Sequence, residues 1–314
     1  MENSNLYNTF IIVNPTAGDG QAEKRWGNFE NRLRKNNIQY QSVFTEYQNH
    51  ATKLISDAIL SGHKRIGVFS GDGTLNEVIQ GMFKNDKILR ENVKLIYFPA
   101  GSSCDFEKKF NKRRNLIDRI KANDALSIDI FKVECTDFSG KNISRYIVNN
   151  SSIGIISLAN EKFNSVSGLT KIIKQMNVDT GAIICGLKAI TQFCPFNAEM
   201  FLDGENIPLK NLSNVTVFKT AYFGGDMSYG IETVQDDGQL SIVWLDGTSR
   251  LGLTALMPSL FTGKILNKKE AHYRTCREFE LTTEDSVIVE TDGENIGVPP
   301  VKYTILPQAL QVII

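Results

Sequence analysis

The first 120 residues alternate between strand-like and helix-like patterns, and this alternation limits the folds that the chain can adopt. Short apolar runs rich in β-branched residues predict strands at 9–13, 40–44, 66–69 and 93–98. Apolar residues at helical spacing predict helices near 22–36, 51–61, 75–83 and 115–121. Such an alternation is typical of a mostly parallel sheet that is covered by helices on both faces.

After residue 125 the pattern changes to short strand-like runs that are separated by turn signals. The Asp-Gly pairs that begin at Asp203, Asp246 and Asp292 suit tight turns between antiparallel strands. Helical patterns interrupt these runs near 158–163, 169–176 and 252–261. The sequence therefore predicts an α/β domain over residues 1–125 and a mainly β domain over residues 126–314.

The composition excludes several classes of protein. Lys plus Arg equals Asp plus Glu, at 35 each, so no global field attracts nucleic acid and no nucleic-acid partner is expected. The five cysteines show no CxxC spacing and the three histidines form no cluster, which favours a reduced, cytoplasmic chain without disulfides or a zinc site. The polar first residues do not resemble a signal peptide, and no apolar run approaches the ~20 residues of a membrane span. Any membrane contact is therefore expected to be peripheral and transient.

The stretch "RIGVFSGDGTLNEVIQG" combines a predicted strand, a carboxylate between two glycines and a predicted helix. Glycines let backbone amides approach an anion closely, and the start of a helix attracts phosphate. Asp72 repels a bare phosphate, so this turn suggests Mg²⁺-nucleotide chemistry. The alternative is a plain turn in which Asp72 caps the helix. A dinucleotide-binding motif is excluded, because Asn76 stands where the third glycine belongs and no ribose-binding acid follows the next strand.

The same stretch, "SGDGTLNEV", resembles the GGDGTxNEV signature of the diacylglycerol kinase catalytic-domain family, which includes bacterial lipid kinases and sphingosine kinases. Further segments resemble the family's motifs in the family's order: "IIVNPTAGDG", "VFTEY", "FPAGSSCDFEKKF", "YFGGDMSYGIETVQDDGQLSIV" and "ETDGE". The resemblance spans residues 9 to about 310. It implies an NAD kinase/diacylglycerol kinase-like α/β nucleotide-binding domain with a parallel sheet, beside a C-terminal β-sandwich domain.

The resemblance also implies an ATP site. The phosphates are expected over Gly71 and Gly73, with Asn76 closing the turn, Ser102 in a second glycine loop and Thr45 bordering the nucleoside. The complete predicted nucleotide set is Asn14, Thr45, Ser70, Gly71, Asp72, Gly73, Thr74, Asn76, Gly101 and Ser102. Asp72 is also predicted to take part in catalysis.

Three further carboxylates are assigned by the resemblance. Asp292 is the candidate base that orients the attacking hydroxyl, and Glu294 is expected to support it; the alternative is an ordinary hairpin turn. Asp237 is expected to bind a structural Mg²⁺ together with the carbonyl oxygens of Val234 and Gln239, which is a set of ligands that suits a hard cation. The alternative for this segment is again a turn.

Two features near the second glycine loop add expectations. The basic segment "EKKFNKRRN" is either a solvated helix start or a site that attracts polyphosphate or anionic lipid headgroups. Cys104 stands where the family has Asn. Beside Lys108, Lys109 and a helix start, its thiol is expected to have a lowered pKa and to be reactive, the alternative being a buried, inert side chain. The apolar and basic stretch at 256–269 either rests on a membrane interface or packs in the core.

The sequence thus predicts an ATP-dependent lipid kinase that uses Mg²⁺ and phosphorylates a hydroxyl of diacylglycerol or of a related lipid, such as a sphingoid base or phosphatidylglycerol. Its expected partner is the lipid substrate at the membrane surface, and a homodimer stays open. The alternatives are an NAD kinase-like small-molecule kinase and a non-catalytic nucleotide- or lipid-binding module with the same fold.

Overall fold

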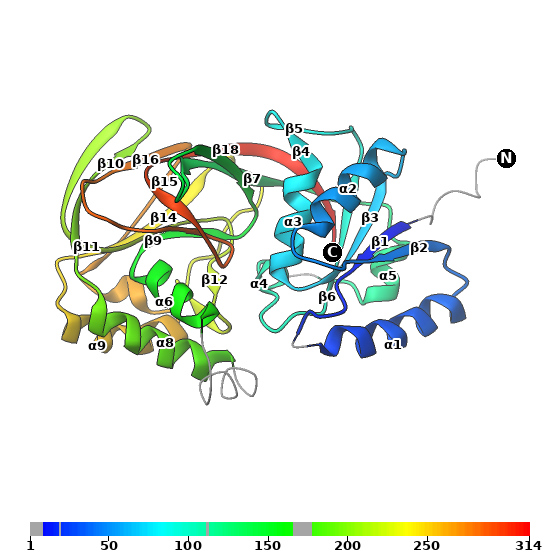
Figure 1. Cartoon of the computed structure of the whole chain (residues 1–314), viewed down its shortest axis with the longest axis horizontal. Coiled ribbons are helices and arrows are strands. Elements are labelled where there is room, and N and C mark those ends of the chain that lie inside the picture. The colour runs from blue at the N-terminus through cyan, green and yellow to red at the C-terminus, as the bar shows by residue number, and fades with distance from the viewer. Residues whose placement is uncertain (1–8, 19, 111–112, 166–177) are drawn as a thin grey trace. The chain divides into compact units, whose positions relative to one another are not determined.

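The computed structural model describes residues 9–18, 20–110, 113–165 and 178–314 (Figure 1). The chain divides into two compact units, residues 1–130 with 307–314, and residues 131–306. The predicted helix near 169–176 lies outside the described residues. Among the helices that are described, none is both long and apolar enough to cross a lipid bilayer.

The first unit is built on parallel strands in the order β18, β6, β3, β1, β2. These are β1 (Thr9–Val13), β2 (Tyr40–Phe44), β3 (Arg65–Ser70), β6 (Lys94–Pro99) and the end of β18 (Glu294–Ile313). All five residues of β1 are buried, as expected for a strand that is covered on both faces.

Helices cover both faces of this parallel sheet (Figure 1). One face packs on α1 (Gln21–Lys35) and α5 (Leu116–Lys121), in a core that includes Ile11, Trp26 and Phe29. The helices α2 (His50–Leu60) and α3 (Asp72–Met82) contact each other and pack on β1 and β3. A ribbon of β4 (Phe83–Lys84) and β5 (Lys87–Ile88) and the short helix α4 (Asp105–Lys108) complete the unit.

The second unit is a set of antiparallel strands. Its long path runs β15, β14, β11, β10, β16, β18, and β9 joins β11 to β17. The strands are β7 (Leu126–Thr136), β8 (Asn142–Ile147), β9 (Asn150–Gly154), β10 (Phe196–Leu202), β11 (Glu205–Phe218), β12 (Tyr222–Phe223), β13 (Met227–Ser228), β14 (Leu240–Asp246), β15 (Ala271–Cys276), β16 (Glu278–Thr282) and β17 (Val289–Thr291).

The described helices of the second unit are α6 (Ile155–Asn164), α8 (Val178–Gln192), α9 (Arg250–Phe261) and the 3₁₀ turn η1 (Ile265–Asn267). A large apolar core is shared by the strands and includes Phe131, Val215 and Phe279. A smaller core joins Phe218 and other strand residues to Leu256 of α9.

The predicted fold class is confirmed, with three differences in detail. The Asp246-Gly247 pair leads from the end of β14 into α9, so it is not the predicted turn between antiparallel strands. Helix α3 begins at Asp72, three residues before the predicted start at Leu75, because Gly71 takes the N-cap position. The sequence assigned the whole C-terminal part to the second domain. In the structure, residues 307–314 belong to the first unit, because Gln311–Ile313 pair in parallel with β6.

Candidate active site

The predicted nucleotide residues follow the carboxyl ends of four parallel strands. Asn14 follows β1, Thr45 follows β2, Gly71 follows β3 and Gly101 comes shortly after β6. Parallel strands place these ends at one edge of the sheet, where α/β proteins bind ligands. Backbone hydrogen bonds join the ends: Asn14 N donates to Phe69 O at 3.1 Å and Thr45 N to Val13 O at 2.9 Å. The structure therefore brings this predicted set together within the first unit.

Two glycine loops touch each other at this edge. A Cβ on Gly101 would lie 2.5 Å from the Gly71 Cα, so Gly101 has no room for a side chain, and a Cβ on Gly71 would lie only 3.2 Å from the Gly101 Cα. Gly73 differs, because a Cβ there would meet nothing within 4 Å. Gly73 lies in the first turn of α3, whose N-cap residue Gly71 offers no side-chain cap. The start of α3 is thus an open, anion-attracting helix terminus beside the second loop.

Asp72 connects the two loops. Its carboxylate accepts hydrogen bonds from the backbone N–H of Asp105 at 2.9 Å and of Phe106 at 3.1 Å. It therefore caps α4, whereas the alternative drawn from the sequence was a cap on its own helix.

Asn14 and Thr74 tie β1 to the start of α3. Asn14 Nδ2 donates to Thr74 Oγ1 at 2.7 Å, while Asn14 Oδ1 accepts from the N–H of Thr16 at 3.0 Å. Ser70 is fully buried and bonds to the carbonyl oxygen of Gly71, and Asn76 bonds to Gln80 within α3. Gly73 and Ser102 are exposed. The buried members of the set therefore fix the loops, and the exposed members are available to a ligand.

The residues that are predicted to act on the attacking hydroxyl belong to the second unit. Asp292 lies in the turn between β17 and β18, with φ of +45°, followed by Gly293 with φ of +92°. Successive positive φ values are typical of a tight hairpin turn. Asn150 fixes the turn from both directions: Asp292 N donates to Asn150 O at 2.9 Å, and Asn150 N donates to Asp292 Oδ1 at 3.1 Å. Glu294 is exposed.

The three predicted Mg²⁺ ligands also converge in the second unit, but on an ammonium group. Lys219 Nζ donates to Val234 O at 2.7 Å, to Asp237 Oδ1 at 2.8 Å and to Gln239 O at 3.0 Å. A metal ion bound to these oxygens would overlap with Nζ, so the residues present do not fit a divalent cation. Among the described residues, no group of three or more His, Cys, Asp or Glu side chains could hold a metal ion.

Comparisons with known proteins identify two domains in the chain. The sequence matches the diacylglycerol kinase catalytic domain over residues 8–133 and the YegS C-terminal NAD kinase beta sandwich-like domain over residues 153–314. The chain belongs to the diacylglycerol kinase catalytic-domain family. At the level of this family it is a lipid kinase and hence a phosphotransferase, and a kinase family implies ATP as the phosphate donor.

Relatives of this diacylglycerol kinase-like chain match it over nearly its whole length. YtlR of Bacillus subtilis (strain 168) is 25% identical over 309 residues, covering 96% of this chain and 98% of its own. A diacylglycerol kinase of Mycobacterium tuberculosis (strain ATCC 25618 / H37Rv) is 22% identical, covering 96% and 93%. A crystal structure from Bacillus anthracis str. Sterne has a TM-score of 0.74 at 22% identity, covering 98% of this chain and 97% of that chain. That likeness confirms the fold.

Cys104 departs from the expectation of a reactive thiol. Burial raises the pKa of its thiol to about 11, against the lowering effect of a hydrogen bond with Tyr97. Nearby Asp72 and Glu107 raise it further. Lys108 forms an ion pair with Asp105 at 2.9 Å, so its charge is already compensated. The prediction of a lowered pKa is corrected to a protonated, poorly reactive thiol.

Two side chains of the basic segment after the second glycine loop contact other residues of the chain. The ammonium group of Lys109 lies 4.4 Å from the centre of the Phe106 ring, and Arg114 donates to the carbonyl oxygen of Ile314 at 3.1 Å. Lys112 lies outside the described residues. These contacts favour a structural role for Lys109 and Arg114.

Buried ionisable residues near the two predicted loops, Arg119 and Glu290, were not predicted from the sequence. Arg119, 1% exposed, pairs with Glu107 at 2.8 Å and so holds the segment after the second glycine loop. Glu290 is buried below the Asp292 turn, and its Oε1 accepts from the Gly293 N–H at 2.5 Å. Burial, with a smaller effect of Asp292, raises the pKa of Glu290 to about 8. The adjoining "TDGE" motif was the available signal for Glu290, whereas Arg119 carried none.

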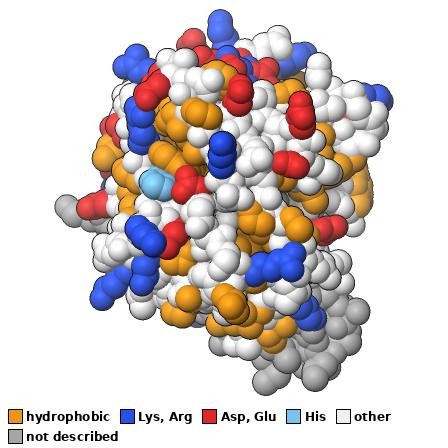
Figure 2. Space-filling model, turned by 90° about the vertical axis from the view of Figure 1, so that its left-hand side faces the viewer, with side chains coloured by type: hydrophobic (Ala, Val, Ile, Leu, Met, Phe, Trp, Pro, Cys, Tyr) orange, Lys and Arg blue, Asp and Glu red, His pale blue; other side chains and the backbone are white. Residues whose placement is uncertain are grey.

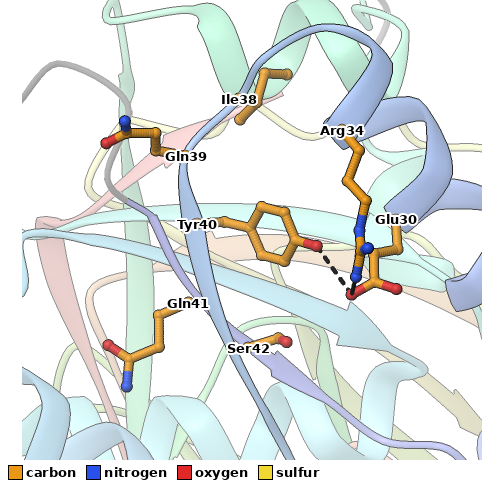
Figure 3. Close-up of a pocket in the computed structure, with 7 residues that line it drawn as sticks. All are labelled: Glu30, Arg34, Ile38, Gln39, Tyr40, Gln41 and Ser42. Carbon is orange, nitrogen blue, oxygen red and sulfur yellow. Dashed lines mark hydrogen bonds and ion pairs between the residues drawn. The ribbon is translucent and has the colours of Figure 1, made fainter.

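The first unit has a surface hollow beside α1 and β2 (Figure 3). It is lined by residues of α1 and β2 and the loop that joins them: Glu30, Arg34, Ile38, Gln39, Tyr40, Gln41 and Ser42. The Tyr40 hydroxyl donates to Glu30 Oε1 at 2.9 Å, and Arg34 pairs with the same oxygen at 3.4 Å. None of the predicted site residues lines this hollow, so no function is assigned to it.

Proposed function

We propose that the protein transfers the γ-phosphoryl group of ATP to a hydroxyl of diacylglycerol or of a related lipid. Gly73 carries this proposal. Glycine in a helix costs about 1 kcal/mol relative to alanine. Apart from its chain neighbours and the backbone of its own helix, no protein atom lies within 4 Å of the place where a Cβ on Gly73 would be. A ligand that comes close to the backbone at the start of α3 explains why a side chain is absent there.

The first unit supplies groups that can bind a nucleoside triphosphate. The backbone at Gly71, Gly73 and Thr74 offers amides to phosphate oxygens, and the exposed hydroxyl of Ser102 offers a further donor. Asp72 is held at a fixed place by Asp105 and Phe106, and its carboxylate is of the kind that binds Mg²⁺ or a water bound to Mg²⁺. ATP with Mg²⁺ supplies the γ-phosphoryl group, and these residues orient the nucleotide and neutralise its charge.

The second unit supplies a carboxylate for the acceptor. Asp292 would accept the proton of the lipid hydroxyl, and its double link to Asn150 orients it for that task. Burial raises the pKa of the neighbouring Glu290 to about 8, so Glu290 is mostly protonated at neutral pH and places little negative charge beside Asp292. Glu294, which is exposed two residues further along the chain, would support Asp292 in this role.

A kinase that phosphorylates a lipid must contact the apolar part of the lipid or of the membrane that holds it. Figure 2 shows hydrophobic side chains on a face of the second unit, with Lys and Arg side chains among them. In this unit Leu251 of α9 is 85% exposed, and Leu187 and Ile183 of α8 are 41% and 37% exposed. Exposed Lys188 and Arg250 belong to the same two helices. Apolar and basic side chains together suit a peripheral contact with an anionic lipid surface.

A transfer assay tests the proposal. Purified protein is incubated with γ-labelled ATP and Mg²⁺, together with diacylglycerol, a sphingoid base, phosphatidylglycerol or NAD. We expect label in at least one lipid and none in NAD. Label in NAD alone would establish a small-molecule kinase. ATP binding with no transfer to any acceptor would establish a binding module.

A further inference from the structure

The strongest unassigned feature is the buried charge of Lys219. The residue is 1% exposed, and its ammonium group donates to three oxygen atoms at 2.7, 2.8 and 3.0 Å. An ammonium group has three protons to donate. The two carbonyl oxygens and the Asp237 carboxylate therefore match its donors in number. A buried charge with this many well-placed partners is a built site rather than a chance contact.

The same three oxygens are ligands that a hard metal ion prefers. Mg²⁺ binds oxygen at about 2.0–2.1 Å and Ca²⁺ at about 2.3–2.6 Å. The Nζ–oxygen distances of 2.7–3.0 Å are those of hydrogen bonds. Since the ammonium group fills the centre of the ligand set, an ion and the lysine cannot occupy it together.

The position of Lys219 in the chain connects this cluster to the Asp292 turn. Lys219 directly follows β11, and its N–H donates to the carbonyl oxygen of Asn149 at 2.8 Å. The next residue, Asn150, is the one that holds Asp292 in both directions. Gln235 Nε2 also donates to Lys219 O at 3.2 Å. Lys219 thus fastens segment 234–239 to the strand end that carries Asn149 and Asn150.

We propose that Lys219 is an internal cation that does the structural work of a divalent metal ion at the Val234, Asp237 and Gln239 oxygens. The ammonium group of Lys219, which is part of the chain itself, then fixes segment 234–239. The second unit therefore requires no divalent ion for its stability. This assignment stands on the contacts of the second unit and holds whether or not the chain transfers phosphate to a lipid.

Thermal melts of the full chain without nucleotide test the assignment. The melting temperature of the wild type is expected to be the same with EDTA as with excess Mg²⁺ or Ca²⁺. If a shift with metal does occur, Asp237→Asn identifies its site. A shift that persists in Asp237→Asn lies elsewhere and agrees with the assignment, and a shift that Asp237→Asn abolishes overturns it.

Removal of the lysine gives the complementary test. Lys219→Ala leaves a buried carboxylate and two carbonyl oxygens without their cation, so its melting temperature should fall by about 10 °C. Because the ligand set is vacated, Mg²⁺ or Ca²⁺ should raise the melting temperature of this variant and not of the wild type. Lys302→Ala is the matched control, since Lys302 pairs with Glu278 and Glu280 but its side chain is 40% exposed. It should change little and not respond to metal.

Two outcomes with Lys219→Ala would overturn the assignment: a melting temperature like that of Lys302→Ala, or a large loss that no divalent cation restores. Should Lys219→Ala fail to fold, Lys219→Met keeps the aliphatic volume and removes the charge. The same predictions apply to it. The wild-type comparison of EDTA with metal is independent of every variant.

Discussion

At the scale of single residues, several aspartates of this chain are held by backbone amides. Asp72 accepts from Asp105 and Phe106, and Asp203 accepts from Arg277 and Glu278. The motif around Asp72 identified it from the sequence, but its partners lie 33 and 34 residues away. Only the meeting of two strand ends at one sheet edge creates that contact. Local patterns cannot reveal it.

Asp72→Asn should affect stability and nucleotide use together. Asn has a single acceptor oxygen for two backbone donors, so loss of the cap on α4 should lower the free energy of unfolding by about 1 kcal/mol. The KM for ATP should rise as well. Chemical denaturation and initial rates measure the two effects. Asn115→Ala removes the cap of α5, where the Asn115 side chain accepts from Ile117 and Asp118, and should lower stability alone. An unchanged KM in Asp72→Asn would remove Asp72 from the nucleotide site.

The thiol of Cys104 should alkylate slowly at neutral pH. With burial raising its pKa to about 11, the reactive thiolate forms only as the pH rises toward that value. Mass spectrometry after iodoacetamide treatment should find exposed Cys194 modified well before Cys104, with the rate at Cys104 increasing with pH. Rapid modification of Cys104 at pH 7 in folded protein would contradict the buried environment described above.

At the scale of elements, the β17–β18 turn joins a predicted base to a buried acid that the sequence did not reveal. The Asp-Gly signal gave the turn correctly, because successive positive φ values favour Asp and Gly. The side chains that hold the turn lie far from it in the sequence: Asn160 and Asn164 of α6 donate hydrogen bonds to Gly293 O at 2.6 and 2.9 Å. These contacts follow from the packing of α6 beside the turn.

Glu290 should make stability depend on pH in a defined direction. Its pKa rises from 4.5 to about 8 on folding, so the folded chain binds more protons than the unfolded chain between these values. This contribution is complete below the unfolded pKa and is lost as pH rises through the folded pKa, at up to about 1.4 kcal/mol per pH unit. Asp292, Tyr303 and Tyr229 are the titratable groups that interact with it.

Urea denaturation from pH 5 to 8 measures this dependence. Glu290→Gln keeps the acceptor for Gly293 N–H and should remove most of the decline, whereas Glu294→Gln, at an exposed position, should leave it as in the wild type. An identical pH profile for Glu290→Gln and wild type would show that Glu290 ionises normally.

At the scale of the whole molecule, the pattern of apolar residues and the turn signals predicted both units. Strands and helices alternate in the first, whereas short strands separated by turns dominate the second. These signals missed the return of the chain to the first unit. The sequence analysis predicted no strand in "LPQALQVII", whereas the structure pairs Gln311–Ile313 in parallel with β6 and buries Ile313 fully. Likewise, the three oxygens around Lys219 were predicted as a group, while the cation came from a residue 15 to 20 positions away.

Removal of residues 307–314 should therefore damage the first unit rather than the second. The truncation deletes the strand beside β6 and the Ile314 carbonyl oxygen that accepts from Arg114. We expect faster hydrogen exchange in β6 and β3, followed by mass spectrometry, with β10 and β11 little changed. Gln311→Ala keeps the backbone pairing and is the control. Equal protection of β6 in the truncated and complete chains would contradict the assignment of these residues to the first unit.

In the proposed function, Asp292 activates a lipid hydroxyl for attack on ATP. The most direct test is the kcat for transfer from γ-labelled ATP to diacylglycerol, measured for wild type, Asp292→Asn and Asp203→Asn. Asp203 also precedes Gly in a hairpin turn, so it controls for effects on turn structure. We expect transfer by the wild type, a ~10²-fold or greater loss of kcat in Asp292→Asn with little change in ATP affinity, and a near-normal kcat in Asp203→Asn. A kcat for Asp292→Asn within a factor of a few of the wild type would contradict this role.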